Sequence, residues 1–170
     1  MIIEDLASEE KSLHSEMREI YLQAATQKSL TRLEEIHATY RSIHQKYAAL
    51  SHQELEALKR GLFLQWYSVS EPHWLTGISD LNETAKQKII ESLVNLITNE
   101  RHDSEIVWML NYYFAINEFA LSGLREAQAV NKLIVKQHNY VFPQTINRTK
   151  MEERGQMGIY WNSLKRFNQD

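Results

Sequence analysis

Four polar residues recur at intervals of seven along an otherwise apolar stretch of the chain. They are Ser104, Asn111, Glu118 and Arg125. Seven residues make almost two helical turns, so this spacing places the side chains close to one face of a helix that we expect over residues 104–121. A few polar groups that converge in an apolar setting are the usual form of a ligand site. This polar stripe is therefore the first candidate site of the sequence.

Glu118 is the most informative member of the stripe because its neighbours in the sequence are mostly apolar or aromatic. A carboxylate in such a setting must reach water, find a partner or take a raised pKa. In one interpretation Glu118 and Asn111 orient a small ligand in an aromatic pocket. The pocket would be lined by Trp66, Trp108 and Tyr112. In the other interpretation, which we favour, the stripe is the solvent-facing edge of a central helix.

The segment 70–74 is a loop that carries a proline, a histidine and a tryptophan in succession. Pro72 ends the preceding helix, because the residue before a proline disfavours helical geometry. A stiffened loop of this kind can be an interaction surface through His73 and Trp74, since tryptophan supplies a large contact area. Alternatively, Trp74 folds back and fills the core under the loop, and this second outcome is the one that we expect.

His37 stands three residues after Glu34 and five after Arg32. Glu-x-x-His is a ligand unit of di-iron helical bundles, but those sites need two copies and this chain has one. The Arg32 and His37 pair resembles the Arg-x4–6-His motif of HEPN-type ribonucleases, which are all-helical. The resemblance covers two residues, and Leu33 stands where that family usually has a polar residue. We therefore expect no catalytic residues, no metal and no cofactor.

Composition excludes several classes of function. The 170 residues include no cysteine, which excludes disulfides, thiolate metal sites and cysteine nucleophiles. The net charge of −3 gives no basic face for nucleic acid. No stretch reaches the roughly 18 apolar residues of a membrane span, and the N-terminus lacks the basic start and apolar run of a signal peptide. We expect a cytoplasmic protein without nucleic-acid or membrane partners.

The charge is unevenly distributed between the two ends of the chain. Residues 1–20 are rich in acidic side chains, and residues 145–170 carry more basic than acidic ones. The two ends could attract each other. Exposed ion pairs contribute little to stability, however, so we favour two separately solvated helix faces.

The apolar spacing predicts an all-α fold of six or seven mostly antiparallel helices, in a bundle or a short HEAT-like array. Only five glycines and two prolines interrupt the chain, which favours long helices. We expect helices over residues 3–25, 31–50, 51–71, 80–98, 104–121, 124–138 and 148–167, with capping boxes that begin at Thr31, Ser51 and Asp80. The helices over 51–71 and 104–121 should be the most buried. Gly155 and Gly158 favour a break in the last helix.

The expected helix over residues 31–50 has the most regular apolar pattern. Its apolar residues alternate spacings of three and four, as in a coiled-coil seam. They are Leu33, Ile36, Tyr40, Ile43, Tyr47 and Leu50. Such a seam can pair with a helix of another chain, which predicts a homodimer through the helices over 3–25 and 31–50.

Two segments of the chain resemble each other at an offset of 46 residues. Leu62–Tyr67 aligns with Trp108–Tyr113, and Leu75–Ile78 aligns with Leu121–Leu124. A period near 46 suits paired-helix repeats of the HEAT kind. We therefore expect residues 1–170 to form one domain. Its parts would be an N-terminal helical hairpin (1–50), two hairpins that could be duplicates (51–140) and a C-terminal helix (141–170).

These patterns favour a non-catalytic cytoplasmic binding protein whose partner is another protein or a second copy of the chain. The alternative function is a small-ligand binder or enzyme that uses an aromatic pocket around Asn111 and Glu118.

Overall fold

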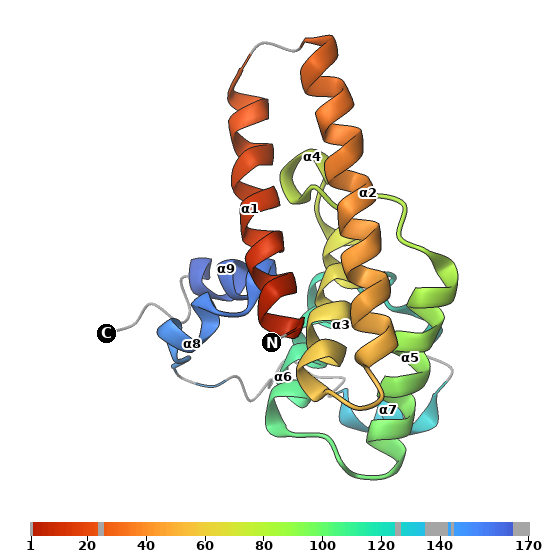
Figure 1. Cartoon of the computed structure of the whole chain (residues 1–170). Coiled ribbons are helices and arrows are strands. Elements are labelled where there is room, and N and C mark those ends of the chain that lie inside the picture. The colour runs from red at the N-terminus through yellow and green to blue at the C-terminus, as the bar shows by residue number, and fades with distance from the viewer. Residues whose placement is uncertain (1, 24–25, 125–126, 135–142, 144, 165–170) are drawn as a thin grey trace.

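The computed structural model of the chain describes residues 2–23, 26–124, 127–134, 143 and 145–164 (Figure 1). Throughout these residues the regular elements are helices, which confirms the all-α prediction. The elements are α1 (Ile2–Leu22), α2 (Gln27–Leu50), α3 (Leu55–Ser70), α4 (His73–Thr76), α5 (Glu83–Thr98), α6 (Ser104–Ile116), the 3₁₀ turn η1 (Ser122–Leu124), α7 (Gln128–Leu133), α8 (Arg148–Glu152) and α9 (Gly155–Ser163). The described part of the chain has more helices than expected because α4 lies in a segment expected as a loop and the last expected helix is divided into α8 and α9.

Helices α1 and α2 form a long hairpin whose far end extends beyond the rest of the molecule (Figure 1). Helix α2 begins four residues earlier than expected. Its capping box is Thr26 and Ser29, where the Ser29 N–H donates to Thr26 Oγ1 (3.1 Å) and the Thr26 N–H donates to Ser29 Oγ (2.8 Å). The expected cap Thr31 lies inside the helix, and its hydroxyl donates to the Gln27 carbonyl.

The other two expected capping boxes are also wrong. The Ser51 hydroxyl donates to the Ala48 carbonyl at the end of α2 (2.9 Å), and α3 begins at Leu55 without a side-chain cap. Helix α5 is capped by Asn82, which accepts from the Ala85 N–H (2.9 Å), two residues after Asp80. Short polar side chains lie near each of these helix starts, so the spacing alone could not select the capping residue.

Helix α3 lies at the centre of the core, as expected, because every residue from Ala57 to Tyr67 is buried. It contacts α2, α5, α6 and α9. Helix α6 is buried from Trp108 to Tyr113. The seam of α2 also faces inward, and its residues Ile36, Tyr40, Ile43 and Tyr47 have no exposed surface. These four seam residues therefore pack in the chain's own core, whereas Leu33 and Leu50 are partly buried.

The last expected helix is broken just before Gly155, one of the two glycines that favoured a break, whereas Gly158 lies inside α9. Helix α8 ends at Glu152 and α9 begins at Gly155, whose positive φ of 61° favours glycine. The two short helices pack closely, since a Cβ on Gly158 would lie 1.6 Å from the Met151 carbonyl oxygen. This packing carries Trp161, which has no exposed surface, into the core.

The region after α6 departs from the expected pattern. Helix α6 ends at Ile116, five residues early, and turns follow up to η1. The expected helix over 124–138 contains α7, but parts of it lie outside the described residues, as do most of the connection over 139–145 and the end of the chain after 164.

Candidate functional site

Asn111 lies on α6, where the sequence analysis placed it, but its amide is occupied by the fold. Asn111 Nδ2 donates to the Val107 carbonyl (2.8 Å) and to the Leu133 carbonyl (3.0 Å). The second bond ties α6 to α7, and the residue is buried. Glu118 lies beyond the end of α6 and is exposed. The stripe therefore divides into a buried structural amide and a surface carboxylate.

The three aromatic residues expected to line a pocket do come together. Trp66 stacks on Tyr113 with ring centroids 4.6 Å apart, and also lies edge-on to Tyr112. Trp108 lies edge-on to Trp161 at 4.8 Å. Trp161 of α9 also contacts Tyr112 and Tyr113, with ring centroids 5.0 and 5.9 Å apart. The aromatic residues of α3 and α6 therefore form a packed cluster, which the C-terminal helix completes.

The residues His73 and Trp74 lie on α4, at the side of the α1–α2 hairpin. Trp74 is 52% exposed, so the expectation that it fills the core is wrong. Helix α4 ends at Gly77, which has a φ of 74° and donates its N–H to the His73 carbonyl. This turn buries Thr76 and Ile78 and leaves His73, Trp74 and Leu75 on the surface.

A cleft of about 410 Å³ lies between the outer parts of α1 and α2 and the start of α4. Its lining residues are Tyr21, Gln27, Leu30, Thr31, Leu33, Glu34, His37 and His73. His37 Nδ1 is 2.8 Å from the Gly77 carbonyl oxygen, and the His37 and His73 rings are 5.9 Å apart. No group of three or more His, Cys, Asp or Glu side chains among the described residues could hold a metal ion.

Arg32 does not join His37 in a ribonuclease-like pair. Its guanidinium binds both oxygens of Glu16 at 2.6 and 2.8 Å, and it binds Glu35 at 2.7 Å. The contact with Glu16 links α2 to α1, and the contact with Glu35 lies within α2. The structure therefore gives Arg32 a role in holding the hairpin together.

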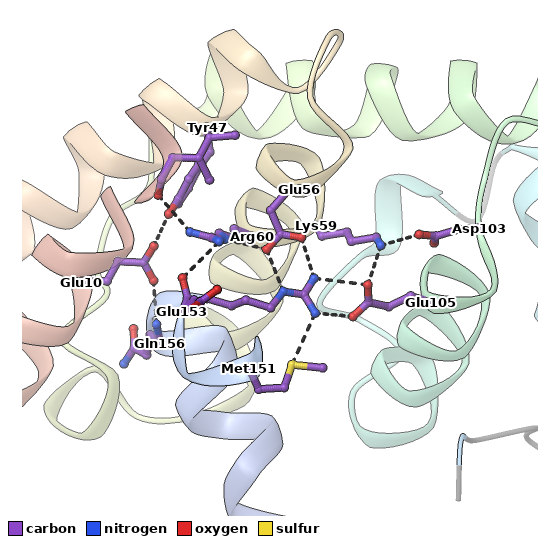
Figure 2. A network of polar contacts seen from close by, with 12 residues as sticks. Glu10, Tyr47, Glu56, Lys59, Arg60, Asp103, Glu105, Met151, Glu153 and Gln156 are labelled. Atoms are coloured by element: carbon purple, nitrogen blue, oxygen red, sulfur yellow. Dashed lines mark hydrogen bonds and ion pairs between the residues drawn. The ribbon is translucent and has the colours of Figure 1, made fainter. Parts of the chain in front are cut away.

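A network of partly buried charges joins α3, the start of α6 and the N-cap residue of α9, and the sequence analysis did not predict it (Figure 2). Arg154 makes two parallel bonds to Glu56, each of 2.7 Å, and also binds Glu105. Lys59 binds Asp103 and Glu105, each at 2.5 Å. Burial would raise the pKa of Glu56, but the hydrogen bonds and charges of Arg154 and Arg60 hold that pKa below its ordinary value.

Glu10 lies at the edge of this network and is 1% exposed (Figure 2). Its Oε1 accepts from the Tyr47 hydroxyl (2.5 Å), and its Oε2 accepts from the Gln156 N–H (2.9 Å). The absence of a side chain on Gly155 makes room for the carboxylate, because a Cβ there would lie 2.7 Å from Oε2. The acidic start of the chain and the beginning of α9 therefore meet through a buried contact, so the expectation of two separately solvated faces is wrong at this point.

Burial raises the pKa of Glu10 to about 7, even though the bonds from Tyr47 and Gln156 lower it. A carboxylate with a pKa near neutrality is suited to general base chemistry. Glu10, however, has both oxygens occupied by protein donors and almost no exposed surface. In this conformation it joins α1, α2 and α9 and does not face a substrate.

One signal in the sequence could have found Glu10. It occupies the buried face of α1, in the series Leu6, Glu10, Leu13 and Met17, with spacings of four, three and four. A carboxylate at such a position must have buried partners. Arg154 gives no comparable signal, because its partners Glu56 and Glu105 lie 98 and 49 residues away.

Comparison of the chain with protein-family models, with curated proteins and with solved structures finds no match. Among the described helices, none has the length and apolar character required to cross a membrane.

The variant Glu10→Gln is expected to become more stable relative to the wild type as the pH rises. The pKa of Glu10 is higher in the folded chain than in the unfolded chain. Its contribution to stability is therefore complete below about pH 4.5 and is lost as the pH rises to about 7. Glutamine can keep both contacts, because the Tyr47 hydroxyl can accept from the new amide. Between pH 5 and pH 8 the variant should gain about 2 kcal/mol relative to the wild type in urea unfolding.

The quantity to follow is the difference in unfolding free energy between the variant and the wild type. The wild type alone is not sufficient, because His44 changes stability with pH in the opposite direction to Glu10. Burial lowers the pKa of His44 to about 4. Both folded proteins therefore lose stability as the pH falls from about 6.5 to 4, because His44 must take up a proton in a buried position. Glu9→Gln, which changes an exposed carboxylate on the same helix, is the matched control. A difference between Glu10→Gln and the wild type that does not vary with pH would show that Glu10 keeps an ordinary pKa.

Proposed function

We propose that this chain is a non-catalytic binding protein that docks a partner protein on the far end of its α1–α2 hairpin. Five large apolar side chains on α1, α2 and α4 are exposed at this end, and we call them the hairpin-end surface. They are Tyr21, Leu22, Leu30, Trp74 and Leu75. Contiguous exposed apolar patches on folded proteins commonly mark interaction sites.

The contact between Tyr21 and Trp74 supports the view that this surface is continuous. Their ring centroids lie 6.3 Å apart in an edge-on arrangement, which joins α1 to α4. Tyr21 and Leu30 both line the cleft between the helices, which joins α1 to α2. A partner that covers the surface would therefore contact three elements at once. Trp and Tyr are the residue types that dominate binding energy in protein interfaces.

The buried seam of α2 bears on the homodimer predicted from the sequence. The seam residues Tyr40 and Tyr47 pack inside the chain, so pairing through the seam would require the core to open. A second copy of the chain would instead have to use an exposed apolar surface, and the hairpin-end surface is the one that we propose. Sedimentation of the wild type and of a variant in that surface separates these two possibilities.

The test of this function uses the double variant Leu30→Ser, Trp74→Ala. Both side chains are about half exposed, so the variant should melt close to the wild-type temperature. The control is Ile2→Ser, which removes an exposed apolar side chain at the other end of α1, roughly 30 Å from Tyr21. Each protein is used to co-purify partners from the cells that produce it, with quantitative mass spectrometry.

We expect at least one protein to co-purify with the wild type and with Ile2→Ser and to be lost with the double variant. The purified partner should then bind the double variant at least about tenfold more weakly in calorimetry, as expected when an aromatic anchor is removed. Equal recovery of every partner by all three proteins would contradict the proposal.

A further inference from the structure

We propose that the cleft beside the hairpin-end surface binds an arginine or lysine side chain that the partner presents between apolar residues. This inference rests on the proposed function and specifies the chemistry of the partner. The observation behind it is that an acidic side chain and a histidine lie next to each other on one face of α2. The Glu34 carboxylate and the His37 ring line the cleft between apolar and aromatic side chains.

Glu34 supplies a negative charge that no described residue neutralises. It is exposed and has no ion-pair partner among the described residues. It is also the only carboxylate or permanent cation among the residues that line the cleft. Arg32 is nearby in sequence, but its charge is already paired with Glu16 and Glu35. Lys28, on the same helix, does not line the cleft.

His37 supplies a second acceptor. A carbonyl oxygen can only accept, so the nitrogen 2.8 Å from the Gly77 oxygen, Nδ1, must carry the hydrogen. In the neutral ring Nε2 then carries a lone pair. Glu34 and His37 are three residues apart on α2, so both groups lie on the same side of the helix. Two groups in the polar part of the cleft, the Glu34 carboxylate and His37 Nε2, can therefore accept from a hydrogen-bond donor.

The apolar part of the cleft suits the rest of a long cationic side chain. Leu30 and Leu33 can pack against its methylene groups, as the stems of lysine and arginine commonly pack on apolar surfaces. The exposed rings of Tyr21 and Trp74 can attract its charged group. A volume of about 410 Å³ has room for one long side chain and part of a neighbour.

Other partner chemistries fit the cleft less well. A carboxylate would face the negative charge of Glu34 and the lone pair of His37. A purely apolar segment would take both acceptors out of water without giving them a donor, which costs free energy. A cationic segment with apolar flanks matches the cleft and the surrounding hairpin-end surface together.

The test selects phage-displayed random 12-residue peptides on the immobilised full chain. Enriched peptides are synthesised, and their dissociation constants are measured for the wild type, Glu34→Gln and the charge-matched control Glu9→Gln. We expect enriched peptides to carry arginine or lysine between apolar residues. Glu34→Gln should weaken their binding about fivefold, as for a partly exposed ion pair, and Glu9→Gln should not. Replacing the peptide's cation by methionine should weaken binding to the wild type but have little further effect in Glu34→Gln.

The other outcomes separate this inference from the proposed function. Peptides that lack a cation, or that are acidic, and that still lose binding in the Leu30→Ser, Trp74→Ala double variant would overturn the inference and leave the docking surface in place. Peptides whose binding does not change in that double variant, or the absence of any enriched peptide, would contradict both. Melting curves of Glu34→Gln establish that the variant is folded.

Discussion

Replacing Arg154 by alanine is expected to lower the free energy of unfolding by about 3 kcal/mol. The Arg154 side chain is 11% exposed and lies between the carboxylates of Glu56 and Glu105, which are 32% and 21% exposed. Removing the cation of a buried ion pair typically costs about 3 to 5 kcal/mol, because the remaining charges stay desolvated. The lower end of that range applies here, because Glu56 and Glu105 are partly exposed, and because Arg60 still binds Glu56 and Lys59 still binds Glu105.

The measurement is urea unfolding followed by circular dichroism, with a thermal melt that should fall by roughly 10 °C. Arg32→Ala is the matched control, because Arg32 also makes two bonds to one glutamate and a third bond to another. The Arg32 and Glu16 side chains are 41% and 36% exposed, so this variant should lose no more than about 1 kcal/mol. If the two variants lost equal free energy of unfolding, burial would not make the stability of the protein depend more on Arg154 than on Arg32.

Replacing Gly158 by alanine is expected to destabilise the protein by about 3 kcal/mol, although alanine is the better helix former. Helix propensity alone predicts a gain of roughly 1 kcal/mol, because Gly158 lies inside α9. The structure predicts the opposite sign, since the added Cβ would lie 1.6 Å from the Met151 carbonyl oxygen. Backbone atoms of α8 cannot move aside as a flexible side chain can, so α9 would have to shift and withdraw Trp161 from the core.

Gly123→Ala is the control for this prediction. A Cβ at Gly123 would meet no atom within 4 Å, and its φ is not positive, so its stability should stay the same or rise by up to about 1 kcal/mol. Urea unfolding gives the sign directly. Near-ultraviolet circular dichroism reports the aromatic cluster and should change in Gly158→Ala alone. A stability gain in Gly158→Ala would show that α8 does not pack against α9 as described.

Local sequence patterns predicted the fold class because the apolar spacing that indicates a helix extends over only a few residues of the sequence. The spacing of apolar residues identified α3 and α6 as buried helices, and both are buried. Gly155 predicted the break between α8 and α9, since a positive φ favours glycine whatever the rest of the chain does. Capping was less predictable, because several short polar residues compete at each helix start.

The side of each loop that faces solvent was not predictable from the sequence. Trp74 looked like a core residue because of its size, but the turn at Gly77 directs it outward beside Tyr21. The polar stripe was correct as a helical spacing up to Asn111, but α6 ends before Glu118. Periodicity gives a position on a helix, and it does not say where tertiary packing ends that helix.

The sequence by itself determined an all-helical chain, two of its buried helices and the break before α9. Only the tertiary structure decided which charged residues are buried and which apolar residues are exposed. Glu10 and Gln156 are 146 residues apart, and Arg154 and Glu56 are 98 apart. The residue pattern of one helix shows which side chains three or four residues apart can meet, whereas these pairs depend on how separate helices dock. The same docking places Tyr21, Glu34 and Trp74 around one end of the hairpin, where the proposed partner would bind.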